Sequence, residues 1–166
     1  MISSPGWPNR VQFTTDLRSA VHRAREHGEE VSLFYVDLDR FKPVNDEFGH
    51  DVGDVLLAAV GERLKSCARA TDVVARLGGD EFAFLFTAQS ADALTAVPER
   101  VQAAFARAFP VAGREIHLGA SVGRSVFPID GSDAETLLRH ADAAMFEAKR
   151  TRGVLRSGLA AAPVLA

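Results

Sequence analysis

Two carboxylates at the end of an apolar stretch are the first residues in this sequence whose type and position suit chemistry. Asp37 and Asp39 close the apolar residues 31–38, which read as a central strand covered on both faces. Asp39 suits the N-cap of a short helix over residues 40–47. Asp37 has no such local function, and desolvating a carboxylate is costly unless it is paired or metal-bound, so its position favours a functional role. A calcium loop is excluded because Lys42 replaces the turn glycine that an EF-hand requires.

A second acidic pair follows a predicted hairpin turn. Residues 73–77 and 82–86 have the β-branched and aromatic content of buried strands, and a Gly-Gly pair separates them at residues 78–79. This pair predicts a primed two-residue turn and would also let phosphates approach the main chain. Asp80 and Glu81 come next, and neighbouring strand residues point to opposite faces, so at most one can face the core side. An ordinary hairpin with solvated acids is the alternative.

Other charged residues each have a structural explanation when considered alone. Asp54 is placed in the first turn of a helix, where the helix dipole favours an acid. The basic residues 149–152 lie near a helix C-terminus, where cations are stabilising. Arg69 and Asp72 are spaced like a common surface ion pair. None of these positions indicates a function by itself.

Hydrophobic periodicity and turn residues predict the elements that must position these groups. Asn9 and Gly28 bound the first helix, and Pro98 should kink or restart the third long one. Helices are expected over residues 10–27, 40–47, 50–68, 90–109 and 133–150, and strands over residues 31–38, 73–77, 82–86 and 116–122.

Length and composition indicate one soluble globular domain. We expect a lead-in over residues 1–8, a domain over residues 9–153 and a tail over residues 154–166. The single cysteine, Cys67, excludes an intrachain disulfide, and the absence of a signal peptide predicts a cytoplasmic location. A net charge of -3 gives no reason to expect nucleic-acid binding, and no apolar run is long enough for a transmembrane helix, so no membrane contact is expected from this segment.

Several motifs together resemble the GGDEF family, the diguanylate cyclases. Residues 78–82 read Gly-Gly-Asp-Glu-Phe, the family signature, with the expected Arg76 before it. Residues 37–54 match the second long motif nearly position for position, and residues 120–123 and 141–149 resemble a later strand and the last helix. Two long motifs in the right order are far more specific than either alone.

The resemblance implies both a fold and an activity. The fold would be an α/β sandwich of the α+β kind, with a mainly antiparallel central sheet flanked by helices, as in ferredoxin-like palms of polymerases and nucleotide cyclases. Family members condense two GTP molecules into cyclic di-GMP, and divalent Mg²⁺ or Mn²⁺ neutralises the triphosphates. Each domain binds one GTP, so a homodimer would be the active form.

The same resemblance implies a role for individual residues. Asp37, Asp80 and the main-chain carbonyl of Leu38 match the metal ligands, and oxygen ligands suit Mg²⁺ or Mn²⁺. The remaining matches are Asp80 with Glu81 for proton removal, Lys42 for phosphate charge in the transition state, Asn45, Asp54, His50 and Phe41 for guanine, Gly78 and Gly79 for phosphate access, Lys149 with Arg152 for the triphosphate, and Arg69 with Asp72 for inhibition by bound cyclic di-GMP. Asp54 can accept from the N1 and N2 donors of guanine, which favours GTP over ATP.

Two departures from the family pattern concern the ends of the domain. The N-terminal motif, an acid followed by Leu-Thr-Gly-Leu, is replaced by residues 4–10 without the acid, and Gly153 is followed by Val154 instead of arginine. Arg150 or Arg152 would have to replace that cation, which predicts weaker nucleotide retention. Two alternatives to the enzyme therefore stay open: a receptor for cyclic di-GMP and a regulatory GTP-binding module. The lead-in before the first helix could be where an upstream regulatory domain is joined in a longer protein.

Overall fold

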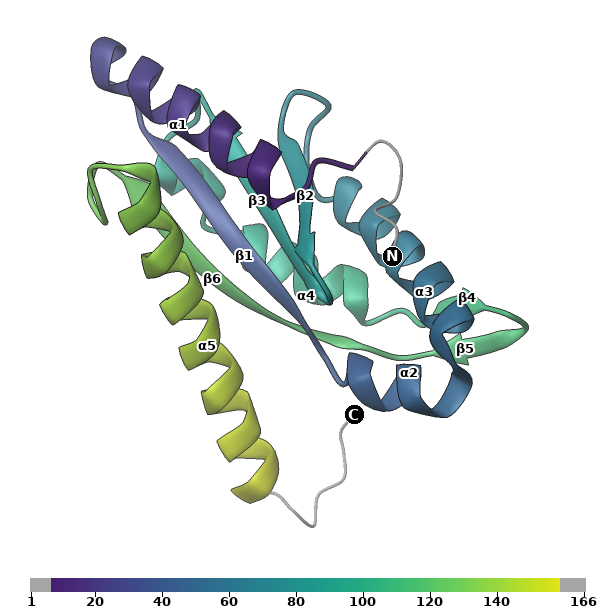
Figure 1. Ribbon diagram of the computed structural model, residues 1–166. Coiled ribbons are helices and arrows are strands. Elements are labelled where there is room, and N and C mark those ends of the chain that lie inside the picture. The colour runs from purple at the N-terminus through teal and green to yellow at the C-terminus, as the bar shows by residue number, and fades with distance from the viewer. Residues whose placement is uncertain (1–6, 159–166) are drawn as a thin grey trace.

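The computed structural model describes residues 7–158, with side chains through residue 151. Its centre is a four-stranded antiparallel sheet in the order β2-β3-β1-β6 (Figure 1). The strands of this sheet are β1 Val31–Asp39, β2 Val73–Gly78, β3 Glu81–Thr87 and β6 Gly119–Phe127. A separate hairpin pairs β4 Phe109–Val111 with β5 Arg114–Ile116. The predicted fold class, an α+β sandwich around an antiparallel sheet, is confirmed.

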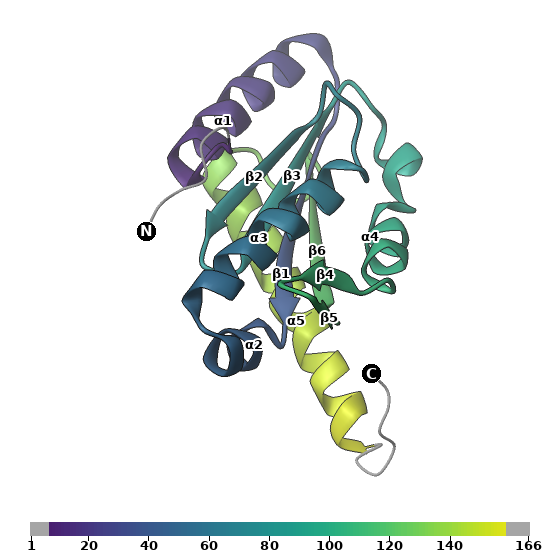
Figure 2. The same cartoon turned by 90° about the vertical axis from the view of Figure 1, so that its right-hand side faces the viewer.

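Helices cover both faces of the sheet (Figures 1 and 2). On one face lie α1 Arg10–His27 and α5 Ala134–Gly158, and on the other lie α2 Phe41–Phe48, α3 His50–Lys65, the 3-10 helix η1 Ala91–Leu94 and α4 Val97–Phe105. Two hydrophobic clusters, one on each face, form the core. Over residues 7–158 the structure contains no helix with the length and hydrophobicity that a membrane span requires.

The alternation of β1 decides where its acids point. All nine residues of this strand are buried, as predicted for a strand covered on both faces. Phe34, Val36 and Leu38 pack toward α3, whereas Leu33 and Tyr35 pack toward α1 and α5. Successive strand residues face opposite sides, so Asp37 lies on the α1–α5 side of the sheet.

Several local predictions are confirmed by the same coordinates. Asn9 caps α1 by accepting a hydrogen bond from the Gln12 amide at 2.9 Å, and Gly28 ends the helix in the left-handed conformation. A new helix, α4, starts at Val97 with Pro98 in its first turn, as predicted, and the 3-10 helix before it is capped by Ser90, which accepts from the Ala93 amide. The predicted hairpin strands form β2 and β3.

The glycine turn is placed one residue later than predicted. Gly78 pairs with Glu81, so Gly79 and Asp80 are the two turn residues. Gly79 has a φ of 48°, which glycine adopts without a steric penalty, while Asp80 is not among the residues with positive φ. The turn therefore carries Asp80 at its tip instead of at the start of a strand.

The prediction that Asp39 caps α2 is wrong. Arg40, with a φ of 70°, occupies the N-cap position and makes no side-chain capping bond. Asp39 is instead the last residue of β1, buried, and its Oδ1 accepts a hydrogen bond from the Ser121 hydroxyl at 2.9 Å. The strand continues one residue past Leu38, which turns Asp39 inward toward β6.

Three element boundaries also differ from the predictions. The predicted helix over residues 90–109 consists of η1 and α4, and Phe109 already begins β4. The predicted strand over residues 116–122 is divided, because β5 ends at Ile116 and β6 begins at Gly119. Helix α5 continues past Gly153. Helix α3 starts at His50 as predicted, which puts Asp54 in its second turn instead of its first.

Close packing of α5 on β6 depends on a glycine. A Cβ added to Gly123 would lie 2.1 Å from the Met145 amide nitrogen and 2.3 Å from the Ala141 carbonyl oxygen. Because both neighbours are helix backbone, a side chain at Gly123 would push α5 away from the sheet. This contact sets the position of Lys149, one turn further along α5.

Candidate functional site

The end of β1 and the glycine turn meet at one edge of the sheet. Asp37 is the register partner of Glu81, and the Leu38 amide donates to the Asp80 carbonyl oxygen at 3.1 Å. Opposed residues of an antiparallel pair share a face, so Asp37 and Glu81 point to the same side. The two distant acidic segments of the sequence are thus brought together by β-sheet register.

The acids at this edge repel one another. The pKa of Asp80 is raised by burial and then by the neighbouring Asp37 charge. Burial and Asp37 also raise the pKa of Glu81. Like charges in a partly desolvated site disfavour ionisation, which makes the site a favourable place for a cation.

Two cations face these acids from the helices on that side. The Lys149 ammonium donates to Asp37 Oδ2. Burial lowers the pKa of Lys149, but the hydrogen bond and charge of Asp37 outweigh that effect and the net shift is upward. Arg10 approaches Glu81 Oε1 at 3.4 Å and donates to the Tyr35 hydroxyl at 3.2 Å. We define Asp37, Asp80, Glu81 and Lys149 as the signature site.

Arg10 was not predicted as a site residue. Its position right after the Asn9 cap puts it at the first residue of α1, beside the strand face that carries Tyr35 and Glu81. The alternation of β1 and β3 would have identified that face, but sequence alone does not say which helix end lies over it.

The residues predicted to bind guanine lie on α2 and α3. The Asn45 amide nitrogen is 3.0 Å from His50 Nδ1, and Phe41 is partly buried against the core. A Cβ on Gly53 would lie 2.0 Å from Asn45 Oδ1, so a side chain at this position would displace the Asn45 amide. Asp54 is exposed in the next position of α3.

Lys42 pairs with a carboxylate of its own helix in this structure. Its ammonium pairs with Asp46 at 2.9 Å, one turn along α2, and its side chain is 83% exposed. An exposed pair of this kind contributes little stability, so Lys42 is able to exchange Asp46 for an anionic ligand at small cost.

The donor set at the signature site fits a divalent cation. Within residues 7–158, no three His, Cys, Asp or Glu side chains are grouped to hold a metal. The predicted set has only two carboxylates, Asp37 and Asp80, with a main-chain carbonyl from Leu38, and it does not require a third side chain. Adjacent acids with a raised Asp80 pKa, together with Lys149 as counter-cation, are consistent with an oxygen-ligand site for Mg²⁺ or Mn²⁺.

Cations for a triphosphate are described only in part. Lys149 reaches the site, whereas Arg150 pairs with Glu147 at 2.6 Å on the exposed side of α5. The side chain of Arg152 lies outside the described residues. Gly78 and Gly79 are exposed at the turn, with no neighbouring atom within 4 Å of an added Cβ.

Arg69 and Asp72 form a second site at the start of β2. Arg69 Nη2 lies 3.5 Å from Asp72 Oδ1, and the Arg69 amide donates to Asp72 Oδ2 at 2.7 Å. Both residues line a pocket of about 520 Å³, whose other walls come from Pro8, Asp16, Lys65, Ala68, Ala70, Val73 and Val74. An exposed guanidinium beside a pocket suits an anionic or guanine-bearing ligand.

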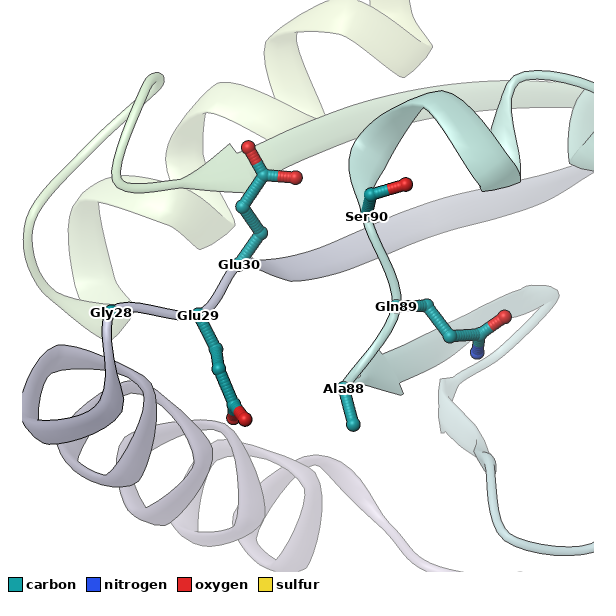
Figure 3. A pocket seen from close by; sticks show the side chains of 6 residues that line it. All are labelled: Gly28, Glu29, Glu30, Ala88, Gln89 and Ser90. Atoms are coloured by element: carbon teal, nitrogen blue, oxygen red, sulfur yellow. The ribbon is translucent and has the colours of Figure 1, made fainter.

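A further pocket, of about 440 Å³, lies at the other end of the sheet (Figure 3). It contains none of the predicted site residues. Glu29 and Glu30 project from it in different directions, and Glu30 Oε1 accepts from the Ala91 amide at 2.6 Å. Glu30 thus has a structural role at the start of η1.

Known proteins share both the sequence and the fold of this chain. The family model of the diguanylate cyclase GGDEF domain matches residues 5–153. The bifunctional diguanylate cyclase/cyclic di-GMP phosphodiesterase MucR of Pseudomonas aeruginosa is 39% identical over 143 residues, which cover 86% of this chain and 21% of MucR. The chain spans about a fifth to a third of the length of the curated relatives it matches.

Solved structures agree with this assignment. The GGDEF domain of TpbB from Pseudomonas aeruginosa is 36% identical with a TM-score of 0.82, over 88% of this chain and 92% of that one. The GGDEF domain of DgcB from Caulobacter crescentus, solved with cyclic di-GMP, is 25% identical with a TM-score of 0.80, over 91% and 94% of the two chains. This chain therefore belongs to the GGDEF domain family of diguanylate cyclases.

Proposed function

We propose that this domain is a diguanylate cyclase, which condenses two GTP molecules into cyclic di-GMP and releases pyrophosphate. The observation that carries the proposal is the meeting of Asp37 and Asp80 beside Lys149, at a turn where Gly78 and Gly79 leave room for phosphates. Names of relatives such as MucR and TpbB agree with this activity.

Each group at the site has a task in this reaction. Asp37, Asp80 and the Leu38 carbonyl would hold Mg²⁺ or Mn²⁺, which supplies charge neutralisation for the triphosphate and the reacting oxygens. Asp80, with Glu81 beside it, removes the proton from the attacking 3′-hydroxyl. Lys149 binds the triphosphate, and Lys42 leaves Asp46 to neutralise charge on the phosphates.

Guanine is selected by the α2–α3 pair. Asp54 accepts from the guanine N1 and N2 donors, and Asn45 binds the base edge with His50 and Phe41 beside it. Adenine lacks these two donors, so the same pocket would leave Asp54 unpaired with ATP.

Two domains must cooperate, because each holds one GTP and the product joins two. We infer a homodimer in which the two signature sites face each other, so that each 3′-hydroxyl attacks the α-phosphate of the other nucleotide. Proximity in such a dimer replaces a bimolecular encounter between bound nucleotides.

Product inhibition is proposed for the Arg69–Asp72 pocket. Arg69 is 59% exposed and offers a planar fork to a phosphate or guanine edge, while Asp72 can accept guanine donors. The cyclic di-GMP complex of the DgcB domain shows that a related domain binds this product.

A direct assay tests the enzymatic proposal. Purified protein incubated with GTP and Mg²⁺ should form cyclic di-GMP, detected by chromatography, and Asp80→Ala should abolish the product while the circular dichroism spectrum stays unchanged. Synthesis retained in Asp80→Ala would contradict the role assigned to Asp80.

A second candidate function is a cyclic di-GMP receptor that does not turn over GTP. The intact pocket at Arg69 and Asp72 favours it, and so do the altered N-terminal motif and the missing arginine after Gly153. Binding of cyclic di-GMP by calorimetry, without any synthesis from GTP, would select this function over the enzyme.

A further inference from the structure

Arg76 bonds to the signature turn in a way that none of the predicted roles explains. Its side chain donates from Nε at 3.1 Å and from Nη2 at 2.9 Å to one acceptor, the Gly79 carbonyl oxygen. Its own amide donates to the Pro8 carbonyl oxygen at 3.0 Å, which ties β2 to the segment before α1. Arg76 as a residue is only partly buried, and these two bonds to Gly79 are its side-chain hydrogen bonds within the described residues.

The turn that receives these bonds has little rigidity of its own. Gly78 and Gly79 have φ angles of 149° and 48°, and the pairing of β2 with β3 is irregular between Arg76 and Gly78. Glycine restricts the backbone less than any other residue. A turn of this composition would sample several orientations of Asp80 unless other groups held it.

The peptide groups on both sides of Asp80 are held by different parts of the sheet. Its own carbonyl oxygen accepts from the Leu38 amide of β1 at 3.1 Å. The carbonyl just before it, that of Gly79, accepts both bonds from Arg76 of β2. These bonds hold the main chain on both sides of Asp80, whose side chain interacts with that of Asp37.

We infer that Arg76 is a positioning residue for Asp80: its fork on the Gly79 carbonyl fixes the turn in the orientation that catalysis needs. The inference rests on the proposed diguanylate cyclase activity. Arginine suits this task because its planar fork directs two N–H groups from a rigid geometry, which a lysine ammonium on a flexible stem does not reproduce.

Kinetics of purified variants with GTP and Mg²⁺ test the inference. In Arg76→Ala we expect kcat to fall by about 10- to 100-fold with KM for GTP within about twofold, because small misplacements of a catalytic group cost up to about two orders of magnitude. Arg76→Lys should recover only part of the loss. Added guanidinium ion should rescue Arg76→Ala in a saturable manner and leave the wild type unchanged.

Arg18→Ala is the matched control, since Arg18 pairs with Glu135 on the outside of α1 and α5 and is 60% exposed. It should keep kcat within about twofold, as surface pairs contribute little. A rise in KM as large as the fall in kcat for Arg76→Ala, without rescue, would overturn the inference in favour of a substrate contact. An unchanged kcat would overturn it outright.

Hydrogen exchange of the nucleotide-free protein supplies a readout that does not depend on turnover. Amides of residues 78–81 should exchange at least about fivefold faster in Arg76→Ala than in the wild type, while amides of α1 stay unchanged. Equal exchange at the turn would contradict the positioning role. A wild type that exchanges as expected but makes no cyclic di-GMP would refute the proposed function and leave the fixed turn established.

Discussion

The carboxylates of the signature site repel one another, whereas the carboxylate of Asp72 in the Arg69–Asp72 pair is stabilised by its neighbours. At the signature site, burial first and then the Asp37 charge raise the pKa of Asp80 and of Glu81. Asp72, in contrast, has a side chain only 2% exposed, but it accepts hydrogen bonds from the Arg69 amide at 2.7 Å and from Gln89 at 3.3 Å, and it forms an ion pair with the Arg69 guanidinium at 3.5 Å. The signature site places several carboxylates close together, whereas the single carboxylate of Asp72 has its own hydrogen-bond donors and a paired cation.

The signature site therefore needs an added cation, whereas the charges of the Arg69–Asp72 pair already balance each other. Repulsion among carboxylates lowers stability until a counter-cation arrives, and Lys149 supplies only part of that charge. The Arg69–Asp72 pair needs no such addition, so a ligand would bind to it with little reorganisation. Replacing a cation, and then an aspartate, at each of the two places tests this contrast.

The largest effect is expected from replacing the cation of each site by methionine. Lys149→Met removes the ammonium that neutralises Asp37 and binds the triphosphate, so kcat/KM for GTP should fall about 100-fold, or about 2.7 kcal/mol. Arg69→Met should keep initial-rate kcat/KM within about twofold but raise the cyclic di-GMP concentration for half-inhibition at least about tenfold. Steady-state kinetics with and without added product measure both quantities.

Equal losses of kcat/KM in the two methionine variants would remove the distinction between the sites. Arg139→Met, on the same helix as Lys149 and bonded only to Thr136 over the described residues, is the control for helix effects and should match the wild type.

The next effect concerns the stability of the satisfied carboxylate. Asp72→Asn replaces a charged acceptor of three contacts by an amide, so unfolding should become easier by about 1–3 kcal/mol, the usual cost of losing hydrogen bonds to a buried polar group. Urea unfolding followed by circular dichroism measures it. An unchanged midpoint would mean that the contacts of Asp72 contribute nothing net.

The features of the fold and site that the sequence predicts are those set by residues close together in the chain. The caps of α1 and the two strands around the glycines follow from short-range patterns, and the structure has them as predicted. The proximity of Asp37 and Asp80 was expected only from the family resemblance, because neither segment alone determines the register between β1 and β3.

The misplaced predictions share a physical cause. The local sequence predicts that Asp39 caps a helix, but pairing with β6 extends β1 by one residue. The Asp39 carboxylate then accepts a hydrogen bond from the Ser121 hydroxyl. The hairpin of β4 and β5 was missed because both strands are only three residues long. Arg76 and Arg10 were left without roles because each acts on a partner that tertiary structure brings to it, and no local spacing indicates such a contact.

A smaller effect with the opposite sign is expected at the signature site. Asp80→Asn removes one charge from a set of repelling carboxylates, so the nucleotide-free protein should become more stable by up to about 1 kcal/mol, or about 2–4 °C in Tm for a domain of this size. Calorimetry without divalent cations measures the shift. A lower Tm for Asp80→Asn, like that expected for Asp72→Asn, would show that the two carboxylates do not differ in the way described.

The smallest expected effect is the pH dependence of the difference in stability between Asp80→Asn and the wild type. Asp80 has a raised pKa in the folded protein, so the folded state keeps its proton longer than the unfolded chain, whose pKa is near 3.8. The wild type therefore loses stability relative to Asp80→Asn as pH rises from that value through the folded pKa, and the difference then stays constant. Tm measured for both proteins across this range should show a gap that widens with pH. A gap that narrows as pH rises would mean that the site favours the Asp80 carboxylate, and the repulsion from Asp37 could not then be what prepares this edge of the sheet for a cation.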